Sequence, residues 1–159
     1  GSGRAVVPDS IREQLLANVR TTLLLITVAG GYSVNIGTVS RGHLSPLETF
    51  ALPSASILPV TDRPDYGAGV LRRVLTFTVR VWIDTATLAN VGNVLEGVIA
   101  DVERVLRVDS RRAGLAEDTR EGEGGVQYIY LASTESLAGA DLHVDVDYRT
   151  SIASPLVGG

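Results

Sequence analysis

The densest group of side chains that could do chemistry lies near the C-terminal end of the chain. Asp141, His143, Asp145 and Asp147 occur at every second position, and alternate residues of a strand share one face. A His surrounded by carboxylates can bind a metal, but this group lacks a second His, and a flat strand does not surround a cation. We therefore interpret these residues as a solvated or partner-facing sheet surface, and we expect no metal site.

The other residue patterns in the chain give little support for catalysis. His43 and His143 are the only histidines, and no G-x-S-x-G motif is present to anchor a Ser-His-Asp triad. The glycines of 67–69 and 122–125 lack Walker spacing and do not lie between a strand and the start of a helix, as phosphate binding requires. We therefore expect no enzyme activity and no cofactor.

The composition narrows the class of protein further. A chain of 159 residues fits a single domain with a real core. The net charge of −4 argues against binding nucleic acid through bulk positive charge. The absence of cysteine excludes disulfides and thiolate metal sites. No apolar run approaches the roughly 20 residues that span a bilayer, and no secretory signal is evident, so we expect an intracellular site of synthesis and no membrane partner.

The clearest structural pattern spans residues 71–107. Apolar side chains alternate from Leu75 to Ile83, which predicts a strand with one buried face. After Asp84, a candidate N-cap, the period changes to the three-and-four spacing of a helix face. The helical stripe consists of Leu88, Val91, Leu95, Val98, Val102 and Val105.

The rest of the chain supplies one more helix and four strands. Ser10 and Glu13 fit a capping box that opens the first helix, and Gly30-Gly31 is expected to end it. Strands are expected at 32–40, 55–61, 126–133 and 140–150, the second of them short or at an edge because of its prolines. The order α-β-β-β-α-β-β predicts a single α+β domain, with a mixed or antiparallel sheet and both amphipathic helices on one face.

Several segments are expected to be flexible because they are rich in Gly, Pro and charged residues. They are an N-terminal arm at 1–8, loops at 62–70 and 109–125, and a C-terminal tail at 151–159. Trp82 falls on the more polar side of its strand. It either packs under a loop at the sheet edge or anchors a subunit interface, where Trp is enriched.

The arrangement resembles the tail terminator (tail completion, minor tail protein U-like) family of long-tailed bacteriophages. The resemblance runs from about Ile11 to Tyr148. It rests on the segments IREQLLANVRTTLLLI, GYSVNIGTVSR, ALPSASILPV, LTFTVRVWID, DVERVL and LHVDVDY.

This resemblance implies a structural virion protein. Family members form a hexameric ring on the head-proximal end of the tail tube, stop its polymerisation and present a docking surface for the head or neck. The implied partners are further copies of the chain, the tail tube protein, a head–tail connector or neck protein and the tape measure protein. Genomic DNA would pass through the lumen without specific binding. The implied location is the virion tail, after assembly in the host cytoplasm.

Two alternatives remain open. The chain could be another ring-forming neck or head–tail connector protein, or, in a different class, a small-molecule hydrolase or binding module. The residues expected at subunit or tube contacts are mostly charged and lie in or beside the two loops. They are Arg63, Tyr66, Arg72, Arg73, Arg111, Arg112, Glu121 and Glu123, with Trp82 as the aromatic candidate.

Overall fold

The computed structural model describes residues 9–42, 53–66, 71–85, 90–130 and 137–150. The elements follow the predicted order, and their bounds are α1 (Ile11–Leu23), β1 (Thr38–Arg41), β2 (Ser54–Tyr66), β3 (Leu71–Asp84), α2 (Val91–Val108), β4 (Asp118–Tyr130) and β5 (Leu137–Thr150). Within these residues, neither helix is long and apolar enough to cross a bilayer.

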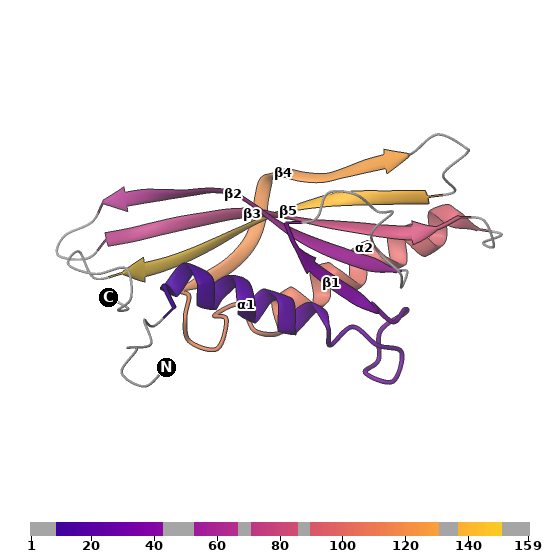
Figure 1. Ribbon diagram of the computed structural model, residues 1–159, viewed down its shortest axis with the longest axis horizontal. Helices are drawn as coiled ribbons and strands as arrows, with labels where there is room; N and C mark the ends of the chain where they lie inside the picture. The colour runs from indigo at the N-terminus through magenta and orange to yellow at the C-terminus, as the bar shows by residue number, and fades with distance from the viewer. Residues whose placement is uncertain (1–8, 43–52, 67–70, 86–89, 131–136, 151–159) are drawn as a thin grey trace, which may run out of the picture.

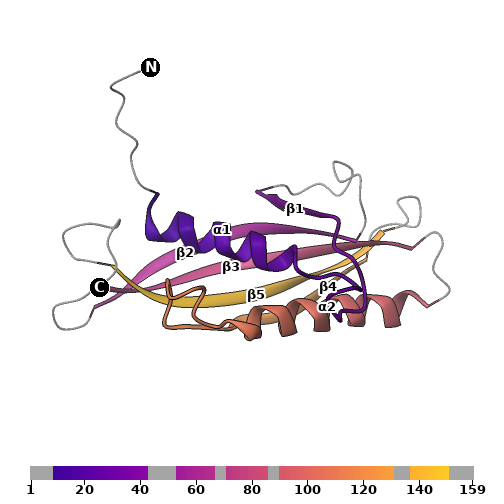
Figure 2. The same ribbon diagram turned by 90° about the horizontal axis from the view of Figure 1, so that it is seen from below.

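The strands form one mixed sheet in the order β1-β2-β3-β5-β4. β1 runs parallel to β2, and the other neighbours are antiparallel. Both helices lie on the same side of the sheet, as the two views in Figure 1 and Figure 2 show. The predicted α+β class, the order of elements and the placement of both helices on one face are therefore confirmed.

The core fills the space between the helices and the sheet. From β3 and β5, the side chains of Phe77, Val79 and Val146 are fully buried, and they meet Val19 of α1 and Val98 of α2 in one cluster. Burying each such side chain contributes about 1.5–3 kcal/mol. The two-residue and three-to-four-residue periods of 71–107 thus identified the central strand and the helix that packs on it.

The N-terminus of α1 matches half of the predicted capping box. The Ser10 hydroxyl accepts a hydrogen bond from the Glu13 backbone N–H at 3.1 Å. The Glu13 carboxylate instead binds the Arg41 guanidinium through two bonds of 2.7 and 2.9 Å. The helix also ends at Leu23, earlier than predicted, although Ile26 in the following turn is still fully buried.

The strand expected at 32–40 is shorter than predicted because α2 holds its first residues. Asp101 accepts hydrogen bonds from the Ser33 backbone N–H and hydroxyl at 2.9 and 2.6 Å. The Arg104 guanidinium lies 4.2 Å from the centre of the Tyr32 ring. These contacts tie the chain to a helix, so strand pairing begins only at Thr38.

The start of α2 also differs from the prediction. Asp84 was expected to cap the helix, but it is the last residue of β3 and pairs with Leu137 of β5. The helix begins at Val91, with Asn90 at the N-cap. Leu88, predicted on the helix stripe, lies outside the described residues.

Large parts of both predicted loops are strands. Residues 62–66 belong to β2, and 118–125 belong to β4. β2 tolerates Pro59 and Pro64 because β1 pairs only with Ser54–Ile57, which leaves the rest of β2 at an edge. Of the segments expected to be flexible, 1–8, 67–70 and 151–159 lie outside the described residues.

The packing of Trp82 on Gly139 gives a testable prediction. A Cβ at Gly139 would lie 2.3 Å from the Val81 carbonyl oxygen and 2.7 Å from the Trp82 ring. Gly139→Ala should therefore lower the free energy of unfolding by about 1–3 kcal/mol, measured by urea denaturation. The matched control is Gly92→Ala in α2, where a Cβ meets nothing within 4 Å. That variant should be up to about 1 kcal/mol more stable, and equal effects of the two changes would contradict this packing.

Candidate assembly surfaces

Four of the residues predicted at subunit contacts lie at two separate edges of the sheet. Arg63 is exposed on β2. Tyr66 is the last residue of that strand, and its side chain is outside the described part of the structure. Glu121 and Glu123 are exposed on β4. Because β3 and β5 lie between β2 and β4, the structure does not bring the two groups together. Of these residues, the exposed one on β2 is basic and the exposed ones on β4 are acidic, while the neighbouring Arg120 of β4 is paired with Asp145 and Asp147 of β5.

The remaining predicted contact residues vary in their accessibility. Arg111 is exposed, and the half-exposed Arg72 guanidinium lies 3.9 Å from the Glu117 carboxylate. Trp82 is only 4% exposed, and its ring packs on Gly139. Of these three, Arg111 and Arg72 are available to a partner without a rearrangement.

Arg112 is fully buried and caps the C-terminal end of α2. Its guanidinium donates to the Leu106 carbonyl at 2.5 Å and to the Asp109 carbonyl. It also lies 3.3 Å from the Thr22 hydroxyl of α1. Burial lowers the pKa of Arg112, partly offset by Asp109. These internal contacts argue against the predicted partner contact, so we leave Arg112 out of the proposed surfaces.

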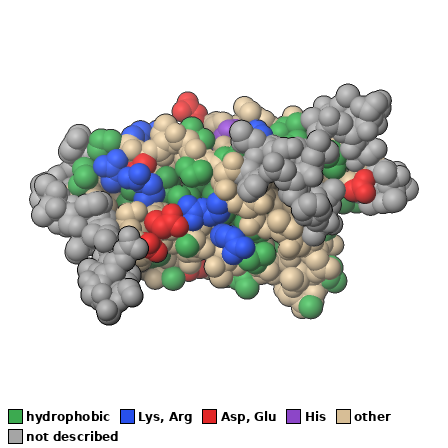
Figure 3. All heavy atoms as spheres, in the orientation of Figure 1, with side chains coloured by type: hydrophobic (Ala, Val, Ile, Leu, Met, Phe, Trp, Pro, Cys, Tyr) green, Lys and Arg blue, Asp and Glu red, His purple; other side chains and the backbone are tan. Residues whose placement is uncertain are grey.

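Charged side chains on the surface form mixed pairs. On the face shown in Figure 3, basic and acidic side chains lie next to one another. On the sheet face opposite the helices, Arg80 binds Asp141 through two bonds of 2.7 and 2.8 Å. Arg120 of β4 binds Asp145 at 3.1 Å and Asp147 at 3.0 Å.

The Asp/His ladder of β5 is thus held by its neighbours on the sheet. Thr76 donates to Asp145 at 2.6 Å, and Thr78 lies 3.2 Å from the His143 ring nitrogen Nδ1. Among the described residues, no group of three or more His, Asp and Glu is placed to hold a metal ion. The ladder forms a polar surface whose carboxylates are already paired.

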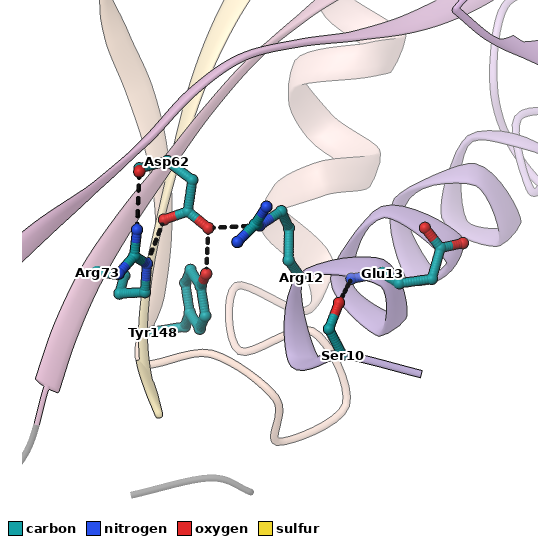
Figure 4. A network of polar contacts seen from close by, with 6 residues as sticks. All are labelled: Ser10, Arg12, Glu13, Asp62, Arg73 and Tyr148. Atoms are coloured by element: carbon teal, nitrogen blue, oxygen red, sulfur yellow. Dashed lines mark hydrogen bonds and ion pairs between the residues drawn. The ribbon is translucent and has the colours of Figure 1, made fainter. Parts of the chain in front are cut away.

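Asp62 forms a polar network that joins four elements, as Figure 4 shows. Its carboxylate accepts hydrogen bonds from Arg12 of α1 at 2.7 Å and from Arg73 of β3 at 2.8 Å. The Tyr148 hydroxyl of β5 donates to the same carboxylate. Because Asp62 itself lies on β2, one carboxylate fixes α1 against three adjacent strands.

Sequence reasoning missed this network. Asp62 was assigned to a flexible loop because Pro64, Gly67 and Gly69 surround it. Its partners Arg12 and Tyr148 are 50 and 86 positions away in the chain, so no local pattern links them. Arg73, predicted as a partner contact, is instead engaged inside the subunit.

The chemistry of this network is structural. Burial and the Asp62 carboxylate raise the pKa of Tyr148 to about 12. The hydroxyl therefore stays protonated at neutral pH and acts as a hydrogen-bond donor rather than a base. Tyr148 also borders a hollow of about 560 Å³ lined by charged residues. Two of them, Arg120 and Asp147, are paired with each other.

A second, smaller hollow lies where β4 leaves its ladder. Pairing with β5 shifts between Glu121 and Val126, and Gly122 and Gly124 of the intervening segment pack on His143. A Cβ at Gly124 would lie 2.5 Å from the His143 ring, so a larger residue there would displace that ring. The irregularity leaves a slot of about 50 Å³ between β4, β5 and the C-terminal half of α2.

Breaking the Asp62 network should destabilise the fold. Asp62→Asn leaves Arg73 and the half-exposed Arg12 without their carboxylate, and leaving partly buried donors unpaired costs about 1–3 kcal/mol. The measurement is urea denaturation followed by circular dichroism. Glu13→Gln is the matched control, since it removes the more exposed pair with Arg41 and should cost at most about 1 kcal/mol. Similar losses for the two variants would contradict a central role for Asp62.

The raised pKa of Tyr148 predicts a specific loss of stability in alkali. Because the folded-state pKa lies above the ordinary value of 10, the contribution is complete below pH 10 and is lost as the pH rises through about 12. The free energy of unfolding of the native chain should therefore fall more steeply over this range than that of Tyr148→Phe. Tyr32→Phe keeps the network and should behave like the native chain.

Comparisons with known proteins do not assign the chain to a family. No family model and no curated protein matches the chain. Among solved structures, the chain is similar to one from a structure described as the virion of a native gene transfer agent (GTA) particle. The identity is 13%, the match covers 89% of this chain and 92% of that chain, and the TM-score is 0.37. A likeness at this level carries no argument about function.

Proposed function

We propose that this chain is a structural virion protein, the tail terminator of a long-tailed phage. Copies of the chain form a ring, expected to be a hexamer, on the head-proximal end of the tail tube. The ring stops further polymerisation of the tube and offers its outer surface to a head–tail connector or neck protein. The tape measure protein is a further partner, and genomic DNA passes through the lumen without specific binding.

The observation that carries the proposal is the order of elements. The resemblance of the sequence to the tail terminator family implies an α+β subunit with the order α-β-β-β-α-β-β. The chain has this order, with one sheet and both helices on one face. The segments that carry the resemblance include α1, most of β3 and the end of α2.

The charges of the two sheet edges favour a ring over a two-fold dimer. Arg63 is exposed on the β2 edge, whereas Glu121 and Glu123 are exposed on the β4 edge. Unlike edges of neighbouring copies attract each other, and two β4 edges repel. Repeated contacts between unlike surfaces produce a ring when the rotation between copies closes.

The edges also favour contact through side chains rather than a continuous sheet. Pro59 and Pro64 lack backbone donors on the open part of β2, and the ladder of β4 is interrupted between Glu121 and Val126. Prolines and irregular edge strands are the usual means by which proteins prevent edge-to-edge pairing. A ring subunit with such edges can meet its neighbours without polymerising into an open sheet.

The proposal predicts that the chain limits the length of tail tubes. Purified chain added to polymerising tube protein should give shorter tubes, each with a sixfold ring at one end, in electron micrographs. The double variant Glu121→Arg, Glu123→Arg removes the charge difference between the edges, so it should fail to form rings and leave the tubes long. The same charge change at Asp9 and Glu96, which are exposed and lie outside β4 and the hollow beside it, provides the control.

Two results would count against this function. Tubes of unchanged length in the presence of excess folded chain would exclude a terminator. Rings that bind only to the portal or neck end of filled heads would instead favour the neck or connector protein.

A further inference from the structure

The slot beside β4 has the size and lining to receive one apolar side chain. Its apolar lining consists of Leu106 of α2, Val126 of β4, and Leu142 and Val144 of β5, and its charged border consists of Glu103, Arg107, Arg120 and Glu121. Its volume of about 50 Å³ is well below the roughly 300–1,000 Å³ of small-molecule sites. A single aliphatic side chain from a protein partner is therefore a better match than a substrate.

A fixed apolar projection exists elsewhere on the same subunit. In the turn after α1, Leu25 is 60% exposed and Val28 is 57% exposed, although Ile26 between them is fully buried. The Val28 backbone N–H donates to the Asn35 side chain at 2.8 Å. The buried anchor and this hydrogen bond hold the turn in one shape, which lowers the entropy cost of inserting it into a partner.

The turn and the slot lie on opposite flanks of α2. Two residues of α2 hold the segment that follows the turn. Asp101 accepts a hydrogen bond from Ser33, and Arg104 contacts Gly31 and Tyr32. Glu103, Leu106 and Arg107 border the slot. At 100° per residue, these two sets of residues are centred roughly 140° apart around the helix. One copy can therefore use both surfaces at once, each with a different neighbour.

The charges beside the two surfaces are complementary. Exposed Arg20 precedes the turn on α1, and Arg104 donates to the Gly31 carbonyl at its end. The slot is bordered by both signs of charge, but Arg107 is paired with Glu103, and Arg120 is paired with Asp145 and Asp147. The exposed acidic residues beside it on β4 are Glu121 and Glu123. The basic residues near the turn thus match the acidic residues near the slot, whereas two turns or two slots would repel each other.

We propose that the apolar turn Leu24–Val28 of one copy inserts Leu25 or Val28 into the β4 slot of the next copy. This contact rests on the self-association proposed above and specifies which surfaces meet. It is directional, because the turn and the slot are different surfaces, so successive copies are related head to tail.

The test exploits the absence of cysteine in the native chain. Leu25→Cys and Glu121→Cys are prepared as separate variants, mixed, and treated with a short bismaleimide. The mixture should give a covalent dimer on a denaturing gel, whereas each variant alone should stay monomeric. A dimer of Leu25→Cys alone would overturn the proposal, since it would place two turns in contact.

A matched pair of exposed apolar residues separates this contact from general surface effects. Leu25→Asp should weaken self-association at least about tenfold, as expected for loss of a central apolar contact. Ala17→Asp adds the same charge at an exposed residue of α1 that lies outside the turn, the slot and both sheet edges, and should leave self-association unchanged. Circular dichroism verifies that both variants are folded.

The two proposals fail in different ways. If the native chain forms rings but Leu25→Asp forms them equally well and no cross-link appears, the turn-and-slot contact is wrong while the ring survives. If the native chain stays monomeric by light scattering, alone and with tail tubes, both the ring and this contact are excluded. If Val60→Asp on β2 disrupts the ring and Leu25→Asp does not, the contact lies on the β2 edge and the slot is not used.

Discussion

The buried carboxylate of Asp62 is the interaction on which the position of α1 depends. A charge removed from water must be paired and hydrogen-bonded, and Asp62 meets this requirement with Arg12, Arg73 and Tyr148. These partners come from α1, β3 and β5, so the need to satisfy one charge fixes a helix against the sheet. The hydrophobic core supplies most of the favourable free energy, but apolar contacts are not directional. The network specifies where along the sheet α1 begins, and thereby where its C-terminal turn projects.

The sequence predicted those parts of the fold that depend on local periodicity. The alternation in 71–84 and the helical stripe that follows gave the central strand and α2, and the order of elements gave the class. The strand content of 62–66 and 118–125 could not be predicted in this way. Both segments are polar and contain Pro or Gly. Residues 62–66 pair with β3 and residues 118–121 pair with β5, because β3 and β5 are long enough to hold them. Local composition does not carry that information, since the partner strands impose it.

The same distinction applies to individual side chains. Arg63, Glu121 and Glu123 were selected because charged residues lay near expected loops, and they are exposed. Arg112 was selected for the same reason, yet it caps α2 from a buried position. Arg112 and Ala113 both adopt positive φ, at 50° and 56°, a conformation that costs energy for residues other than glycine. The Arg112 hydrogen bonds to Leu106 and Asp109 offset this cost, and only the folded structure reveals them.

In the proposed ring, each subunit must meet two neighbours through two different surfaces, and it must avoid adding strands without limit. The glycines between Glu121 and Val126 serve both requirements. By interrupting the β4 ladder, they blunt the edge against strand addition. Two of them, Gly122 and Gly124, pack on His143, and the slot beside them is lined by Leu142 and Val144 next to α2. A regular β4 would pair along its whole length and fill the slot with its own side chains. The irregularity thus replaces a regular sheet edge with a pocket. In the proposed ring, a pocket that receives a different surface of the next copy lets copies add in one direction until the ring closes.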